Sequence, residues 1–333
     1  MSGEGDKSNL CGVILAAGYG ERMRPITDTM PKPLIPVMGR PVFDIVAAKL
    51  KRSGAVSLHA NIHHLPEMFS GSGSEAGIPV TFHREEMILG TGGGIGNMKK
   101  DLENYHLILL HNADVISDIE FQPAIDFHLR EKALFTMILA AGENGPDTAG
   151  EGTLPPPSVY ISDSSRVMEI GAEPDGESRA AGYTGMAVLS REALEYFPAG
   201  RKAGLVGVLR KMINRKEGSV AAYLAPAGGK IPQWAEIGTP SAYLDLHRRI
   251  LIDRTRFDPA LEPPPLPLHV GPGARIGKDA RWTGFLVVGG NAEVGEGSVL
   301  KNCVVLPETK VERETEAEYS ILFPDGIVKA EKR

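Results

Sequence analysis

The chain has few cysteines and no long apolar run. Only two cysteines, Cys11 and Cys303, occur among 333 residues, and they lie far apart. We therefore expect no structural disulfide, and each cysteine is better explained as a small buried apolar residue. No run approaches the length of a membrane span, and the polar start MSGEGDKSN lacks the apolar core of a signal peptide. We expect a cytoplasmic protein that spans no membrane.

Positive charge is also in short supply. The 36 lysines and arginines are outnumbered by 42 aspartates and glutamates, which gives a formal net charge of -6. That balance argues against nucleic acid or an acidic membrane as the main partner. A hydrophobic fraction of 42% supports an ordinary packed core, and the length suffices for one large α/β domain with a smaller appendage.

One segment, residues 15–36, combines glycines with two cations directly after an apolar run. It is LAAGYGERMRPITDTMPKPLIP. Gly18 and Gly20 would let backbone N–H groups close on an anion, because no Cβ intrudes and positive φ is allowed. Arg22 and Lys32 bring positive charge to the same segment. This combination predicts a site for a highly charged phosphate ligand.

Two better-known phosphate loops are excluded by single positions. A dinucleotide-binding fingerprint requires a third glycine where Met23 stands. A Walker A loop requires Ser or Thr after Gly-Lys, and neither Gly229-Lys230 nor Gly277-Lys278 continues in that way. The segment 15–36 is therefore a phosphate loop of another kind.

Strand and helix patterns alternate along the first half of the chain. Helix spacing covers 41–53, strand alternation covers 56–62, and apolar runs occur at 80–82, 107–110 and 135–140. Such alternation predicts an α/β fold with a mostly parallel sheet and helices on both faces. Sites in these sheets gather at the carboxyl ends of the strands.

The second half predicts a different local order. Strand-like pieces at 159–161, 166–170 and 183–189 suggest an antiparallel excursion over the sheet edge, and helices are expected at 191–197, 204–215 and 240–252. Residues 142–158 have the composition of a loop.

A repeat of six residues follows the Pro-rich stretch 261–267. Its lead residues are Val270, Ile276, Trp282, Val288, Val294, Leu300 and Leu306. This spacing resembles the hexapeptide repeat of left-handed parallel β-helices, in which the lead residue points into a narrow core. We therefore divide the chain into a tail at 1–9, a domain at 10–255, a linker at 256–268 and a β-helix at 269–333.

The paired motifs of residues 15–36 resemble the signature of the sugar-nucleotide pyrophosphorylases, which join a sugar 1-phosphate to an NTP. That signature is LAAGxG[ST]R[LM]xP followed by PKP[LM][LIV]P, and Glu21 here replaces the Ser or Thr. Many members end in a β-helix, so the resemblance covers nearly the whole chain. It implies a Rossmann-like sheet and a homo-oligomer assembled through the β-helix.

The resemblance also implies a set of substrate-binding residues. Arg22 and Lys32 would be the catalytic cations on the phosphates, since nucleotidyl transfer depends on positioning and charge neutralisation. The nucleotide would be bound by Leu15, Ala16, Ala17, Gly18, Gly20, Glu21, Arg22, Gly90, Thr91, Gly92 and Asn112. We expect the glycines of 90–94 in a loop before a helix at 95–103.

Mg²⁺ is the implied cofactor, with two acidic ligands. Asp114 follows the apolar run 107–110 in the sequence His-Asn-Ala-Asp, where the family has a magnesium ligand. Glu236 takes the place of the aspartate in the family's D-[IV]-G-[TS] motif and is one methylene longer. The alternatives are an Asx turn for Asp114 and a solvated acid for Glu236.

The sugar side departs from the family pattern. Tyr183, Thr184 and Gly185 resemble the later sugar-binding strand. Glu173, however, stands where relatives have a lysine that contacts the sugar phosphate, and Ser158 stands where they have a glycine. The nucleotide half of the site is well matched and the sugar half is not.

The histidines suggest no second chemistry at this level. His59, His63 and His64 have no cysteine or acidic partner at metal-ligand spacing, so we interpret them as strand and loop residues. His269 begins the β-helix, where acyltransferase relatives use a histidine, but those enzymes need a much longer helix.

Two functions of different classes remain. The first is an NDP-sugar pyrophosphorylase, closest in appearance to the mannose-1-phosphate or heptose-1-phosphate guanylyltransferase branch, with GTP favoured and UTP or dTTP open. The second is a non-catalytic paralogue that binds a nucleotide or sugar nucleotide and regulates a partner. Glu173, Ser158 and Glu236 favour the second, whereas Arg22, Lys32 and Asp114 favour the enzyme.

Overall fold

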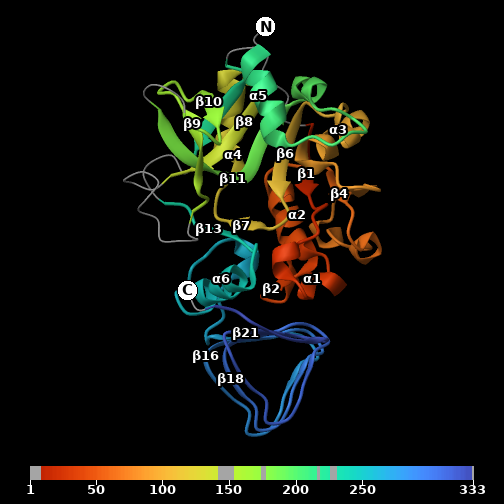
Figure 1. Ribbon diagram of the computed structural model, residues 1–333, viewed down its shortest axis with the longest axis vertical. Helices are drawn as coiled ribbons and strands as arrows, with labels where there is room; N and C mark the ends of the chain where they lie inside the picture. The colour runs from red at the N-terminus through yellow and green to blue at the C-terminus, as the bar shows by residue number, and fades with distance from the viewer. Residues whose placement is uncertain (1–8, 142–153, 174–177, 216–217, 226–230, 332–333) are drawn as a thin grey trace. The chain divides into compact units, whose positions relative to one another are not determined.

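The computed structural model describes residues 9–141, 154–173, 178–215, 218–225 and 231–331 (Figure 1). Its contacts divide the chain into two compact units. The sheet unit comprises residues 1–18 and 46–234, and the coil unit comprises residues 19–45 and 235–333. Most of the expected tail and of the loop 142–158 lies outside the described residues. No described helix is both long and apolar enough to cross a membrane.

The sheet unit is built on a nine-stranded sheet with the order β10-β9-β11-β6-β1-β4-β5, to which β8 and β12 are joined through β11. The strands are β1 Leu10–Leu15, β4 Leu58–Ile62, β5 Val80–Arg84, β6 Leu107–Asn112, β8 Phe135–Ala140, β9 Pro157–Ile161, β10 Val167–Ile170, β11 Arg179–Ser190 and β12 Val220–Leu224. Strands β5, β4, β1 and β6 are parallel. The predicted α/β class with a mostly parallel sheet is confirmed.

The antiparallel part differs from the sequence prediction in one respect. β11 pairs with β6 on one side and with β8 on the other, antiparallel to both. It therefore lies inside the sheet: β6 and β9 pair along one side of it, and β8, followed by β12, lies on the other. The strand is longer than predicted because its small residues before Tyr183 continue the pairing with β9.

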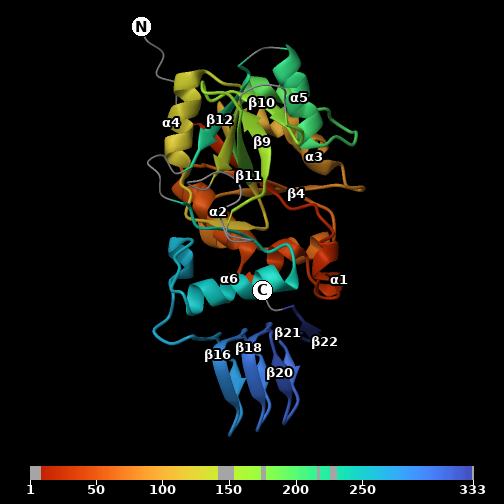
Figure 2. The ribbon, with the colours of Figure 1, turned by 60° about the vertical axis from the view of Figure 1, so that its left-hand side comes forward.

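Helices cover both faces of this sheet (Figure 2). They are α2 Val42–Arg52, α3 Gly90–Leu102, α4 Phe121–Glu131 and α5 Leu205–Arg215. Apolar residues of α3 and α5 share one core with Cys11 and Val13 of β1, whereas Phe127 of α4 packs on the other face against Ala221. The sequence analysis missed α4, and the helix expected at 191–197 is a 3-10 helix, η5 Arg191–Tyr196.

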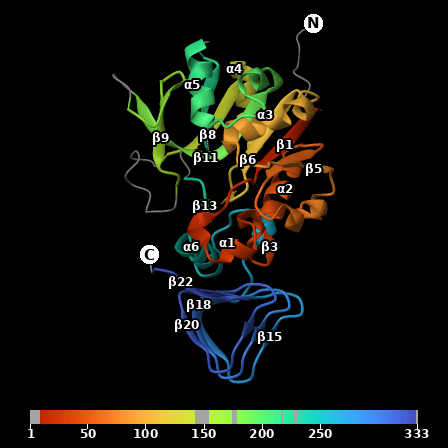
Figure 3. The same cartoon turned by 45° about the vertical axis from the view of Figure 1, so that its right-hand side comes forward.

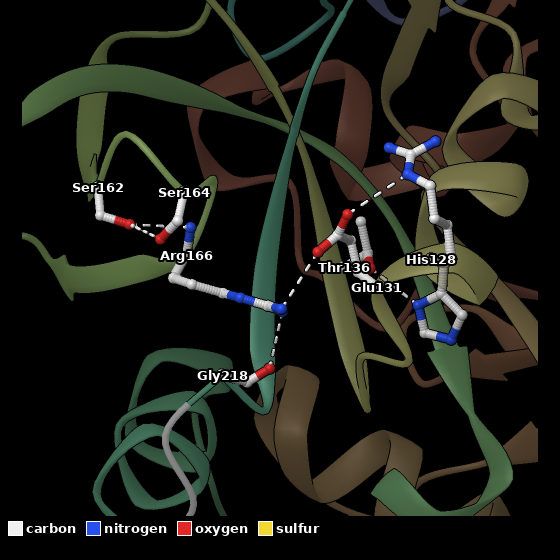
Figure 4. Close-up of polar contacts among 8 residues, drawn as sticks. His128, Glu131, Thr136, Ser162, Ser164, Arg166 and Gly218 are labelled. Atoms are coloured by element: carbon white, nitrogen blue, oxygen red, sulfur yellow. Dashed lines mark hydrogen bonds and ion pairs between the residues drawn. The ribbon is translucent and has the colours of Figure 1, made fainter.

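Polar side chains fix α4 to its neighbours (Figure 4). His128 contacts Thr136 Oγ1 through Nδ1 at 2.8 Å and Ser190 Oγ through Nε2 at 2.9 Å. Ser190 donates its own proton to the carbonyl of Ala133, so it accepts from Nε2–H, and Thr136 donates to Nδ1. His128 is therefore a neutral structural histidine, and its contact with Ser190 activates no nucleophile.

The coil unit ends in a three-sided coil of parallel strands (Figure 3). Its strands are β14 Leu268–Val270, β15 Arg275–Ile276, β16 Arg281–Val288, β17 Glu293–Val294, β18 Val299–Val305, β19 Lys310–Val311, β20 Glu316–Glu318 and β21 Ser320–Phe323. A final strand, β22 Gly326–Lys329, pairs antiparallel with β21. β14, β16, β18 and β21 stack on one side, and β15, β17 and β19 stack on another. The predicted β-helix is present, and the left-handed sense stays a prediction.

The repeat of six residues fails at one position. Leu268 pairs with Leu286, 18 residues on, but Leu286 pairs with Cys303, 17 residues on. The register therefore shortens by one residue in the second turn, and Val305 takes the core position that the repeat assigned to Leu306. The first six lead residues keep the spacing of six, which made the repeat detectable. The register shift comes before the seventh, Leu306, so that assignment was wrong.

Helix α6, Pro240–Leu251, joins the coil to the segment after Lys32. Within this unit the hydroxyl of Tyr243 donates to the carbonyl of Pro36, and the backbone N–H of Met38 donates to His247 Nε2 at 3.4 Å. The imidazole of His247 also stacks on the buried ring of Phe285 in the coil, with centroids 6.5 Å apart. The Pro-Lys-Pro segment is thus anchored by the C-terminal half of its own unit.

The buried histidines should make the protein less stable in mild acid. Burial lowers the pKa of His128 and of His247 to about 4, from an ordinary value of 6.5. The unfolded chain then takes up protons below pH 6.5 while the folded chain does so only near pH 4, so stability present above pH 6.5 is lost as the pH falls between these values. Each histidine should lower the free energy of unfolding by up to about 2 kcal/mol at pH 5.

Urea unfolding at pH 7 and pH 5 measures this effect. His128→Asn should reduce the difference between the two pH values, whereas His106→Gln, which changes an exposed histidine, should leave it unchanged. Equal stability of the unaltered protein at both pH values would contradict the assignment.

Candidate active site

A buried hydrogen-bonded pair, Asn61 and Glu85, organises the carboxyl ends of three parallel strands. The Asn61 amide donates to Glu85 Oε1 at 2.8 Å, and its carbonyl oxygen accepts from the backbone N–H of Ala16 at 3.0 Å. Glu85 Oε2 accepts from the backbone N–H of Leu89 at 2.8 Å. The pair therefore links the segment after β1 to the residue that precedes α3.

Glycines let α3 lie close to this pair. A Cβ on Gly94 would stand 2.7 Å from Asn61 Nδ2 and 2.8 Å from Glu85 Oε1. On Gly96 it would stand 2.2 Å from the carbonyl oxygen of Pro198, which no real side chain tolerates. The expectation of a glycine loop ending at Ile95 was wrong, because these glycines form the first turns of α3, which begins at Gly90.

The start of α3 presents small residues at the positive end of a helix. Gly90 has a φ of 71°, and Thr91 is half-buried. Helix N-termini attract negative charge through unpaired backbone N–H groups. A Cβ on Gly90 or Gly92 would stand 2.9 or 3.0 Å from the carbonyl oxygen of Ala203, so both glycines have a packing role, and the binding of a nucleotide by residues 90–92 stays a prediction.

The two glycines of the first motif differ in their geometry. Gly20 has a φ of 68°, and a Cβ there would stand 2.9 Å from Thr27 and 3.0 Å from Lys32. Positive φ is thus confirmed for Gly20. Gly18 has no positive φ, and no described atom lies within 4 Å of where its Cβ would be. The packing of the described chain therefore does not require glycine at 18, and its role in binding a phosphate stays a prediction.

Asn112 and Asp114 lie at the end of β6, as the sequence predicted. Asn112 is the last residue of the strand, and Asp114 is half-buried in the two-residue turn before β7, Val115–Ser117. Gly185 of β11, with a φ of 80°, lies against Asn112, since a Cβ there would stand 2.9 Å from Asn112 Nδ2. These contacts fix the Asn112 amide at the strand edge.

The sugar-side residues of β11 are largely occupied by the sheet itself. The hydroxyl of Thr184 is fully buried and donates to the carbonyl of Ile138 at 2.7 Å. Its own carbonyl accepts from Trp234 Nε1 at 3.0 Å. Burial raises the pKa of the Tyr183 hydroxyl, so this phenol stays neutral. Because the hydroxyl of Thr184 is engaged by Ile138, a contact of Thr184 with a sugar would have to involve another atom.

The two departures on the sugar side differ in position. Glu173 is exposed, next to Pro174, which lies outside the described residues. Ser158 lies in β9, where its carbonyl accepts from the backbone N–H of Gly171 at 2.7 Å. The roles inferred from the sequence for Glu173 and Ser158 stay predictions.

The coil unit brings Arg22, Lys32 and Glu236 together. Arg22 NH2 lies 2.8 Å from Glu236 Oε1, and Lys32 Nζ lies 3.8 Å from the same oxygen. The Lys32 side chain is only 12% exposed, whereas that of Arg22 is 66% exposed. One carboxylate oxygen is thus shared by a buried ammonium and an exposed guanidinium.

Gly238 makes this cluster possible. A Cβ at this position would stand 2.6 Å from Glu236 Oε1 and 2.8 Å from Arg22 NH2. The glycine of the Glu-Ile-Gly-Thr sequence therefore leaves room for the ion pair. Sequence reasoning identified Glu236 but missed its pairing with the two cations.

Asn61 and Glu85 were also missed, although a signal was present. Each is a polar residue at or just after the carboxyl end of a predicted strand, in β4 and after β5. Such positions gather ligand contacts in parallel sheets. Their buried positions, 4% and 3% exposed, are what the sequence pattern could not supply.

The chain was compared with known proteins. The family model described as nucleotidyl transferase matches residues 11–252. A mannose-1-phosphate guanylyltransferase of Mycobacterium tuberculosis is 28% identical over 90% of this chain and 80% of its own length. An N-acetylmuramate alpha-1-phosphate uridylyltransferase of Neisseria meningitidis is 31% identical over 68% of this chain and 92% of its own length.

A solved structure shows the same fold. HddC from Yersinia pseudotuberculosis superposes with a TM-score of 0.54 at 20% sequence identity, covering 71% of this chain and 97% of that chain. At this identity the likeness concerns the fold alone.

Removing Glu85 should destabilise the protein. Glu85→Ala leaves the Asn61 amide and the Leu89 N–H without an acceptor in the interior, which should lower the free energy of unfolding by roughly 2–4 kcal/mol. Glu86→Ala, at the neighbouring exposed position, should change it by less than about 0.5 kcal/mol. Urea unfolding of both variants provides the comparison, and equal stabilities would refute the anchoring role of Glu85.

Proposed function

Because the chain belongs to the nucleotidyl transferase family, we propose that it transfers a nucleotidyl group from an NTP to a sugar 1-phosphate and releases pyrophosphate. Both relatives described above are named as transferases of this kind, and the chain is an enzyme of this class. The observation that carries the proposal is the cluster of Arg22 and Lys32 on Glu236, at the positions where the family signature places its cations.

The cluster suits a phosphate chain. In the reaction, a phosphate oxygen of the sugar 1-phosphate attacks the α-phosphorus of the NTP, and the bond to the leaving pyrophosphate breaks. Negative charge accumulates on the leaving group, so preorganised cations lower the barrier. Lys32 is suited to this because its buried ammonium is already oriented, and Arg22 can make two parallel hydrogen bonds to phosphate oxygens.

Glu236 holds these cations in the absence of substrate. A carboxylate carries one negative charge, whereas a triphosphate carries several, so the phosphates would compete for Arg22 and Lys32. The ion pairs of Glu236 with Arg22 at 2.8 Å and with Lys32 at 3.8 Å would keep the two cations close together before the nucleotide arrives. On this proposal Glu236 orders the phosphate site.

Mg²⁺ is proposed as the cofactor. Asp114 fits this ion by donor chemistry, since a half-buried carboxylate at a strand end supplies the hard oxygen that Mg²⁺ prefers. Glu236 fits less well, because its Oε1 is engaged by Arg22, and it would bind the ion through the other oxygen. When bound, Mg²⁺ would neutralise phosphate charge that the two cations leave uncompensated.

The nucleotide would contact the sheet unit through main-chain groups. We assign this contact to residues 15–18 after β1, where Ala16 is fixed by Asn61, and to Gly90, Thr91 and Gly92 at the start of α3. Asn112 would add a side-chain amide at the end of β6. Gly18, where a Cβ would have no described neighbour within 4 Å, leaves the backbone open to a base or ribose.

GTP and a mannose- or heptose-like sugar 1-phosphate are the favoured substrates. The relative from Mycobacterium tuberculosis, which matches nine tenths of this chain, is named for a guanylyl transfer to mannose 1-phosphate. The relative from Neisseria meningitidis is named for a uridylyl transfer, so UTP, or dTTP, is the alternative. Glu173 and Ser158 support a second candidate function, a paralogue that binds a nucleotide and regulates a partner.

Substitution of the central charges tests the catalytic assignment. Lys32→Ala and Asp114→Ala should each lower kcat/KM by at least about 100-fold while the melting temperature changes little, because each removes charge stabilisation of the transition state. Lys51→Ala, at an exposed position on α2, serves as the control and should retain full activity. Full activity in either of the first two variants would disprove the assignment.

Pyrophosphate release tests the reaction and its substrates. Purified protein with Mg²⁺ would be incubated with GTP, UTP, dTTP, CTP or ATP and a panel of sugar 1-phosphates. We expect release with GTP and a mannose- or heptose-type sugar phosphate. No release with any pair, together with a rise in melting temperature on adding a nucleotide, would replace the enzyme with the regulatory binding protein.

A further inference from the structure

Three side chains of the sheet unit converge on one another: His59, His83 and Asp101. In the register of β4 and β5, His59 pairs with Thr81 and Asn61 pairs with His83. Because side chains two residues apart share a face, His59 and His83 project from the same side of the sheet as diagonal neighbours. Asp101, near the end of α3, lies within reach of both.

The distances are short enough for a common ligand. His59 Nδ1 lies 3.1 Å from His83 Nε2, and His83 Nδ1 lies 3.8 Å from Asp101 Oδ2. One possible ligand atom from each residue falls within 4.8 Å of the other two. Among the residues that the structure describes, His59, His83 and Asp101 are the histidine and acidic side chains whose ligand atoms lie this close together.

We propose that His59, His83 and Asp101 form a binding site for a divalent transition-metal ion of the Zn²⁺ type. His59 Nδ1, His83 Nε2 and a carboxylate oxygen of Asp101 are the ligands, and water completes the coordination. The site belongs to residues that the proposed transfer reaction does not use, and it does not depend on that function.

The spacing of the two ring nitrogens supports a shared ion. Two imidazoles bound at about 2.0–2.1 Å to one metal, at angles between 90° and 110°, place their nitrogens about 2.9–3.4 Å apart. The two nitrogens are hydrogen-bonded to each other at 3.1 Å and so already fall in this range. An ion would take the place of the proton between them, which would move to the other nitrogen of its ring. Only the carboxylate must approach, and the Asp101 side chain is 54% exposed and can change its rotamer.

The protonation of the pair is also suitable. In the hydrogen bond between the two rings, one of the facing nitrogens donates and the other accepts, so one lone pair already lies between them. His59 Nε2 is buried with no hydrogen-bond partner among the described residues, so no donor there forces the ring proton onto Nδ1. The Nδ1 lone pair can therefore face the metal.

The ligand set selects the class of metal. Imidazole nitrogens suit Zn²⁺, Ni²⁺ and Co²⁺, whereas Mg²⁺ requires oxygen ligands in near-octahedral geometry. The site is thus distinct in chemistry from the Mg²⁺ proposed for Asp114. An ion here would join α3 to β4 and β5, next to the Asn61–Glu85 pair on the same face of the sheet.

Cobalt titration of the full-length protein tests the site. After removal of metal with a chelator and dialysis, Co²⁺ should give a saturable visible absorption with one equivalent bound, and Zn²⁺ should displace it. His83→Gln and His59→Gln should weaken binding by roughly 100-fold or more, and Asp101→Asn by about 10-fold. His106→Gln, which alters an exposed histidine of the same unit, should change nothing.

A melting experiment provides a second measurement. Zn²⁺ should raise the melting temperature of the unaltered protein and of His106→Gln, but not that of His83→Gln, whose altered side chain lies at the rim of the cluster and should not prevent folding. Absence of saturable Co²⁺ binding, or equal binding by His83→Gln and the unaltered protein, would overturn the proposal.

Discussion

The hydrogen bond between Asn61 and Glu85 fixes three chain segments at once. Through it, the residue after β1, the end of β4 and the residue before α3 share one buried polar network in which each named group has a partner. Such a network is stable only when complete, since an unpaired polar group in the interior costs about 1–3 kcal/mol. The glycine at 94 follows from it, because any side chain there would collide with both members. The strand edge that we assign to the nucleotide is thus positioned by residues that need not touch it.

A second constraint of the same kind operates in the coil unit. Glu236 brings Arg22 and Lys32 to one oxygen, and Gly238 keeps the space clear. The segment that carries Lys32 is in turn held by Tyr243 and His247 of α6. In both units, then, a polar contact with a glycine beside it orders the segments that carry the proposed site residues. The contact is buried in the sheet unit and exposed in the coil unit.

Whether a feature of the fold or the site could be predicted depends on how far apart in the sequence its interacting residues lie. The alternation of strands and helices and the motifs around Gly20 and Lys32 are local patterns, and the α/β class and family followed from them. Asn61 with Glu85, and His59 with His83, are 24 positions apart and meet only because β4 and β5 are adjacent and parallel, which no spacing rule in one sequence reveals. The prediction of a loop at the glycines of α3 was wrong for a related reason. Glycine has a low helix propensity, and here packing on Pro198 and Glu85 imposes the helix. The site residues themselves stay predictions, and their supports are what the structure adds.

The slip in the repeat of the coil falls at Phe285. The corner between Thr283 and Leu286 holds two residues, Gly284 and Phe285, where the next turn holds Asn302 alone. The Asn302 side chain compensates by accepting from the Phe285 N–H, and the ring of Phe285 stacks on His247 of α6. Phe285, which has no counterpart in the shorter next turn, is therefore also the residue that attaches the coil to the helix. The length of a single corner thus determines whether a turn of the coil packs only on its neighbouring turns or also contacts α6.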